Sequence, residues 1–305
     1  MLSVKNIINE FKIDKYVTAL MMLLILNISY SQHQHADYVV LGKSINTRQL
    51  SDGKLEFLNT VFFSEIFTTS DGLVTNGSLK GPGEAKDGLI FPQGKIQFLT
   101  GERQFSLDEL NNNFPDSTYY FDFDTPDGEI RGLPATFKRD GNEIKNPGPI
   151  KITLYQDGKV VEPSLINPDL DLIVSWTPFL KGSPDSLDIA QDMIYVIMGD
   201  CFGNETVHSG HAISNPDALT FESSNFVIDE MNFFPGQSFQ LEVEHSNMDT
   251  DIQFNIEVIV TYAATTFLDI KTIGDRNQEV ACPDIPYRMD GGQTDRQVLS
   301  LTKNL

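Results

Sequence analysis

Short runs rich in Val, Ile, Phe, Tyr and Thr recur along most of the chain, and they constrain its fold more than any other feature. They include ADYVVLG, TYYFDFD, LDLIVSW, MIYVIMG and FNIEVIVTY, and turn sequences such as SDG, TPDG, RDGN and QDGK lie between them. Alternation with a period of two, interrupted by such turns, predicts β-strands. No long helical pattern intervenes, so we expect an all-β fold built of sandwiches.

A polar stretch rich in Gly and Pro, KRDGNEIKNPGPIK at 138–151, divides this pattern into two parts. A repeat supports the division, because FPDSTYYFDFDT at 114–125 is similar to FPGQSFQLEVEH at 234–245. We therefore expect two tandem β-sandwich domains, 32–146 and 147–272. The β pattern fails beyond them, and 273–305 are predicted to form a loosely ordered C-terminal extension.

Residues 1–31 have the pattern of a secretory signal peptide. Three lysines precede the apolar run VTALMMLLIL, and Ser29 and Ser31 supply the small residues that cleavage requires. We expect a mature chain that is secreted, periplasmic or attached to the cell surface. Since no second apolar run has membrane-spanning length, we expect no membrane span in the mature chain.

The chain is strongly acidic, with 43 Asp and Glu against 22 Lys and Arg and a formal net charge of −21. Such a charge repels nucleic acid, so we exclude nucleic acid as a partner. Cys201 and Cys282 are the two cysteines. They would form one disulfide in an oxidising compartment or remain two separate thiols, and the sequence does not decide between these alternatives.

One short helix is predicted in FSLDEL. Ser106 is placed to cap it and Glu109 to reach back to the cap, while Phe105 and Leu110 have the spacing of a hydrophobic staple. We expect the helix to be short, because Asn111–Asn113 and Pro115 stop it.

Three stretches of the second half resemble a fibronectin type III domain. LDLIVSWTPF is similar to that family's second strand with its core tryptophan, here Trp176. MIYVIMGDCFGNETVHSG is similar to the third strand, a turn and a short fourth strand, and FFPGQSFQLEVE is similar to the corner that carries a tyrosine. Phe239 stands at the tyrosine position and has no hydroxyl, whereas Tyr119 keeps one at the repeated position in the first half. More loosely, the whole chain resembles secreted bacterial proteins built from paired sandwiches. The resemblance implies adhesion, spacing or ligand binding more than catalysis.

Two sets of polar residues are candidates for a site. The stretch DCFGNETVHSGH is expected to form an exposed hairpin that would act as a contact surface through Glu205, His208 and His211. Hard oxygen ligands crowd two other stretches, and they make calcium the candidate ion: Asp122, Asp124, Asp127, Asp249 and Asp251. The alternative for these aspartates is a solvated strand face. No cofactor other than calcium is expected.

No nucleophile elbow, HExxH helix or CxxC pair occurs, so the sequence favours a non-enzymatic protein. We expect a binding or interaction module that recognises an extracellular protein or glycan. Exposed aromatic residues would supply a sugar-stacking platform, with Phe62, Phe63, Tyr119 and Tyr120 as its candidates. The alternatives are a carbohydrate-active or other hydrolytic exoprotein, whose site is assembled from distant residues, and a structural spacer.

Overall fold

The computed structural model describes residues 35–70, 72–92, 97–137, 146–201, 204–210, 213, 217–275 and 282. The predicted signal peptide (1–31), part of the predicted linker (138–145) and most of the C-terminal extension lie outside these residues. The described chain is predominantly β, as expected, and its strands form three sheets.

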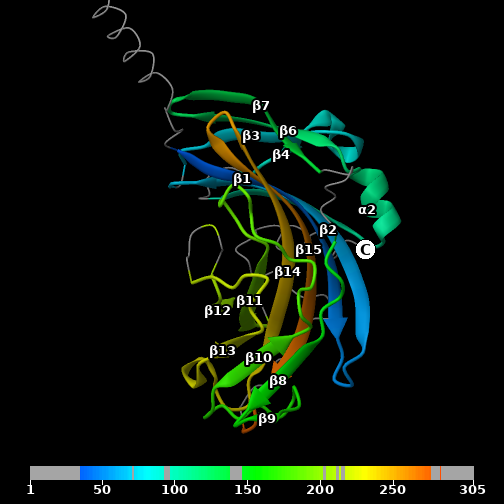
Figure 1. Ribbon diagram of the computed structural model, residues 1–305, viewed down its shortest axis with the longest axis vertical. Coiled ribbons are helices and arrows are strands. Elements are labelled where there is room, and N and C mark those ends of the chain that lie inside the picture. Colours follow the sequence, from blue (N-terminus) through cyan, green and yellow to red (C-terminus); the bar gives the residue numbers. More distant parts are fainter. Residues whose placement is uncertain are drawn as a thin grey trace, which may run out of the picture.

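A long, curved, seven-stranded sheet runs through the molecule (Figure 1). Its strands follow the order β12 (Glu205–His208), β11 (Met193–Asp200), β14 (Ser238–Gln253), β15 (Ile256–Lys271), β1 (Ala36–Gln49), β2 (Leu55–Thr68) and β5 (Gln97–Gln104). Neighbouring strands are antiparallel except β1 and β15, which pair in parallel from Tyr38↔Glu257 to Arg48↔Phe267. The first and last described strands therefore lie side by side in the middle of this sheet.

Two four-stranded sheets pack on the large one. The first has the order β4 (Leu89–Ile90), β3 (Thr75–Lys80), β6 (Thr118–Thr125) and β7 (Gly128–Thr136). The second has the order β13 (Asn225–Ile228), β10 (Leu172–Trp176), β8 (Ile152–Gln156) and β9 (Lys159–Val160). The boundary predicted at 146/147 thus separates the two small sheets, whereas the large sheet takes strands from both sides of it.

Both small sheets cover the same face of the large sheet. On β15, Val258 and Val260 pack into the core beneath the first small sheet, and Leu268 and Ile270 pack into the core beneath the second. These are even-numbered residues of one strand, and residues two apart in a strand point to the same side. We call this the covered face and the opposite side the open face.

Local turn chemistry explains two of the hairpins. Asp157 and Gly158 join β8 to β9, both with positive φ, as the QDGK pattern predicts for a two-residue turn. Phe254 and Asn255 join the two longest strands, β14 and β15, in the same way, with φ of 53° and 60°. A phenylalanine is uncommon in that conformation, and the sequence did not indicate this turn.

Helix α2 (Leu107–Asn113) has the predicted capping box. The backbone N–H of Glu109 donates to Ser106 Oγ at 3.1 Å, and its carboxylate accepts from the N–H of Phe105 at 2.8 Å. The predicted staple is absent because Leu110 is buried while Phe105 is exposed. The helix is short, as predicted: it ends at Asn113, the last of the three asparagines, two residues before Pro115.

Two 3₁₀ turns complete the helical elements, η1 (Gly83–Asp87) and η2 (Glu230–Asn232). No helix among the described residues is long and apolar enough to cross a membrane.

The two predicted corners differ as their sequences indicate. Tyr119 is fully buried and its hydroxyl donates to the carbonyl of Pro115 at 2.9 Å. Phe239 is equally buried but makes only packing contacts there, with its ring edge-on to Phe233 at 5.6 Å between centroids. The hydroxyl bond thus secures the first corner alone.

Cys201 and Cys282 are joined in a disulfide. This resolves the alternative that the sequence left open. The bond ties the end of β11 to the segment that follows β15.

Candidate functional site

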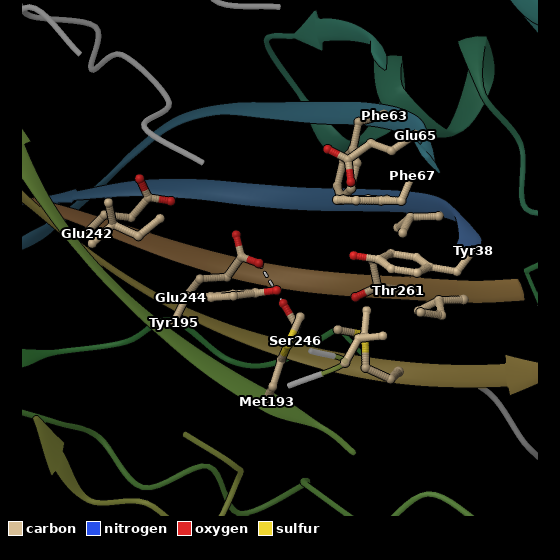
Figure 2. Close-up of a pocket in the computed structure, with 15 residues that line it drawn as sticks. Tyr38, Phe63, Glu65, Phe67, Met193, Tyr195, Glu242, Glu244, Ser246 and Thr261 are labelled. Atoms are coloured by element: carbon tan, nitrogen blue, oxygen red, sulfur yellow. Dashed lines mark hydrogen bonds between the residues drawn. The ribbon is translucent and has the colours of Figure 1, made fainter. Parts of the chain in front are cut away.

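The open face of the large sheet carries the candidate site. The odd-numbered residues of β15, including Ile259 and Thr261, point to this side, together with Tyr38 of β1 and Phe63 of β2. These residues surround a cavity of about 50 Å³, which is room for a few water molecules or a small polar head group. Figure 2 shows the side chains that line it.

Aromatic rings line much of the cavity. Tyr38 and Phe67 stack with ring centroids 4.2 Å apart, and Phe63 and Tyr195 also contribute. Met193 lies near Tyr195 on β11 (Figure 2). The rings come from three strands of the large sheet, β1, β2 and β11.

Three carboxylates complete the wall. Glu65 comes from β2, and Glu242 and Glu244 come from β14, two residues apart on the same side of the strand. Their exposed fractions are 9%, 1% and 7%. None of the described residues that line the cavity is a Lys, Arg or His. The described lining is therefore acidic in composition.

Hydroxyl groups fix the position of Glu244. Its Oε1 accepts from Ser246 Oγ at 2.6 Å, and its Oε2 accepts from Thr265 Oγ1 at 2.8 Å. Ser44 Oγ lies 3.0 Å from Thr265 Oγ1 and donates to Asn46 at 3.1 Å, which extends this buried chain of polar groups across β15 to β1. Because both oxygens are held, the carboxylate points in a defined direction.

The electrostatic surroundings of Tyr38 are acidic. Burial raises the pKa of its hydroxyl, and the neighbouring charges of Glu65, Asp37 and Glu257 raise it further. The pKa of Glu257 is raised as well, by burial first and then by Asp37. Both pKa values are raised, as burial and neighbouring negative charges do to an acidic group.

The segment between β10 and β11 closes one side of the cavity region, where Ile189 and Ala190 pack against the open-face cluster. Two aspartates hold this segment. Asp192 is buried and accepts from the N–H of Met248 at 2.5 Å and from Asn247 at 2.8 Å. Asp185 accepts from the N–H of Ile189 at 2.6 Å. These bonds fix the wall from outside, because neither aspartate lines the cavity.

No protein-family model matches this chain, and no curated protein matches it. The geometry is therefore the basis for any functional argument.

The predicted calcium ligands of β6 have other partners. Asp122 accepts from Lys80 Nζ at 2.9 Å and from the N–H of Gly132 at 2.7 Å. Burial favours a higher pKa for Asp122, but these hydrogen bonds outweigh it and the pKa lies below its ordinary value. Asp124 is bonded to Asn76 and Arg131.

The remaining predicted ligands lie in the turn after β6 and in β14. Asp127 lies 3.4 Å from His35 Nε2. Asp249 and Asp251 belong to β14, in a different sheet, and Asp251 accepts from the N–H of Ile252 at 2.8 Å. Within the described ranges, no group of three or more His, Cys, Asp or Glu is arranged to hold a metal ion.

The predicted hairpin forms between β11 and β12. Asp200 holds its turn through the N–H and side chain of Asn204, at 3.0 and 2.7 Å. Glu205 is exposed, and His208 Nδ1 accepts from the N–H of Gly210 at 2.7 Å. His211 lies outside the described residues. The ring of His208 meets Tyr195 edge-on at 5.6 Å, so the hairpin contacts a residue of the cavity wall.

Strand alternation divides the aromatic residues that the sequence grouped together. Phe63 lines the cavity, whereas its neighbour Phe62 and also Tyr119 belong to the covered core, and Tyr120 is exposed elsewhere. The proposed platform was therefore wrong as a set. His245 also faces the covered side, where it stacks on Phe179 at 4.6 Å. Of these two histidines, His208 therefore contacts the cavity wall, whereas His245 lies on the opposite face of the sheet.

Sequence reasoning missed most residues of the cavity. The available signal was polar alternation inside an apolar strand, with Glu242, Glu244 and Ser246 between Leu241, Val243 and His245. That pattern shows which residues share a face, but it does not show which faces meet across different strands.

Proposed function

We propose that the chain is a secreted, non-enzymatic binding protein of the cell exterior, whose ligand site is the open-face cavity. The observation that carries this proposal is the cavity itself, with aromatic rings and fixed carboxylates on one side of a sheet whose other side forms the cores. A sheet that served only as a spacer would have no need of three buried carboxylates, because burying a charge is costly.

The strand arrangement of the second half supports a fibronectin type III-like module as part of this proposal. Leaving out the two-residue β9, its first, second and fifth strands share one sheet, and its third, fourth, sixth and seventh share the other. Trp176 is buried in the second strand, and its Nε1 donates to Ser223 at 3.2 Å. Modules of this architecture most often serve recognition, which is an argument by analogy.

The experiment is a screen of the mature chain, residues 32–305, against a glycan array and a panel of extracellular proteins, with and without calcium. We expect a specific ligand whose binding is lost in Phe63→Ala, which removes an aromatic wall, and retained in Tyr120→Ala, which removes an exposed ring outside the cavity. Binding that is unaffected by both substitutions would place the site elsewhere. No binding at all would leave the spacer role.

One observation favours a second candidate, the carbohydrate-active hydrolase: three carboxylates converge on one cavity, as acid and base groups do in glycoside hydrolysis. An assay for newly released reducing ends on the same glycans tests it. Activity that is abolished in Glu242→Gln would replace the binding proposal with this one.

A further inference from the structure

The described lining of the open-face cavity combines negative charge with aromatic surface. We propose that the cavity binds a small organic ammonium ion, either free or as the head group of a lysine side chain. This inference rests on the proposed function, since it names the ligand class of the same site.

Charge is the first argument. Glu65, Glu242 and Glu244 all line the cavity and all are at least nine-tenths buried. Partial removal from water strengthens the interaction of a carboxylate with a nearby cation. Three carboxyl groups in the described lining favour a cationic ligand over an anionic one.

The aromatic rings are the second argument, and they separate an organic cation from a metal ion. A metal ion needs several hard ligands in its first shell, whereas Tyr38, Phe63, Phe67 and Tyr195 present π-faces and edges. Alkylated ammonium ions are bound by such rings through cation–π attraction. The absence of a metal-type cluster among the described residues agrees with this choice.

Thr261 supplies an independent sign that a ligand belongs in the cavity. Its side chain is 3% exposed and lines the cavity, in the neighbourhood of Tyr38 (Figure 2). Within the described part of the chain, its Oγ1 has no hydrogen-bond partner. A buried hydroxyl without a partner is unfavourable and is uncommon in native proteins. A hydroxyl or N–H of the ligand would satisfy it.

Together these features define the ligand. It carries one positive charge on nitrogen, has a short apolar body that fits between the rings, and has a polar hydrogen within reach of Thr261. Choline has this chemistry as a free molecule, and the ammonium group of lysine has it as part of a peptide.

The test is isothermal titration calorimetry of the mature chain with three ligands. They are choline, Nα-acetyl-lysine amide, which keeps the ε-ammonium group, and 3,3-dimethyl-1-butanol, the neutral isostere of choline. We expect at least one cation to bind, and the isostere to bind roughly tenfold or more weakly. Choline and the lysine derivative distinguish the two sources of the ammonium group. Equal affinity for choline and its isostere, or no affinity for either cation, overturns the proposal.

Variants test whether the cation binds in the open-face cavity. Glu65→Gln and Phe67→Leu should each weaken cation binding several-fold, while Glu56→Gln should not, because that exposed residue of β2 pairs with Lys54 outside the cavity. Thr261→Val gives a readout that a structural role alone would not give. It should raise the melting temperature of the ligand-free protein, weaken choline, and leave tetramethylammonium, which has no hydroxyl, unchanged.

The two proposals fail separately. If neither cation binds, but a glycan or protein ligand binds and is lost in Phe63→Ala, the ammonium inference is wrong and the binding function stands. If Glu65→Gln and Glu56→Gln affect cation binding equally, the attraction comes from the acidic surface in general and the cavity is not the site.

Discussion

The two faces of the large sheet are made from the same strands and have opposite characters. The covered face is apolar, and charge enters it at Lys43, whose Nζ is buried against Asp116 at 2.6 Å. The open face carries the carboxylates, the hydroxyl chain and the cavity. Each long strand therefore has two roles. One set of alternate residues packs into the cores, and the other set lines the open face, where the candidate site lies.

The largest expected loss of stability comes from truncating a buried ring in the core that packs on the covered face. Phe121→Ala removes a fully buried ring from the first core and should lower the free energy of unfolding by about 3–5 kcal/mol, measured by urea denaturation. Phe63→Ala, on the open face beside an existing cavity, should cost less. Equal losses would mean that both faces are structural.

Acid should lower the free energy of unfolding through His245, which is buried on the covered face. Burial lowers its pKa to about 4, so it is neutral in the folded chain, whereas the unfolded chain takes up a proton near its ordinary pKa of 6.5. The stability that depends on this neutral state is present above pH 6.5 and is lost as the pH falls to 4, by about 3 kcal/mol in all.

The control for this titration is His245→Phe, which keeps a ring against Phe179 and removes the titrating group. The wild-type chain should lose more stability than the variant between pH 6.5 and pH 4. Parallel pH profiles would show that His245 is as accessible to protons as in the unfolded chain.

Two glycines allow the covered core and the open face to be compared by the same substitution. A methyl group at Gly81 would lie 2.1 Å from the Tyr119 ring in the covered core, and one at Gly42 would lie 2.2 Å from the Phe63 ring on the open face. Gly81→Ala should cost about 1–3 kcal/mol in thermal unfolding, because the buried ring has nowhere to move.

Gly42→Ala should cost less stability, because Phe63 can shift toward the cavity, but it should weaken ligand binding. A larger stability loss at Gly42 than at Gly81 would contradict the distinction between the two faces.

The smallest expected effect concerns the first corner. Tyr119→Phe removes the hydroxyl that donates to Pro115 and should destabilise the chain by about 1 kcal/mol. Tyr120→Phe is the control, since that neighbouring side chain is half exposed. An unchanged melting temperature for Tyr119→Phe would show that packing alone holds the corner, as it does at Phe239.

Local features were predictable from the sequence because they depend on neighbouring residues. The strands, the cap at Ser106, the hairpin at Asp200 and the corner at Tyr119 are all of this kind. The cavity was not predictable, since Tyr38, Glu65 and Glu244 meet only through the pairing of β1, β2, β14 and β15. The pairing of β1 with β15 joins residues 219 positions apart, and period-two patterns carry no information on which strands become neighbours.

That same pairing has a consequence for how the chain acquires its structure. Synthesis at about 5–20 residues per second delivers β15 many seconds after β1. Until then the edge of β1 that later bonds to Val258 and Val260 is an open template for other chains. Folding is therefore tied to the arrival of the last described strand, and this edge of β1 is open to aggregation until β15 pairs with it.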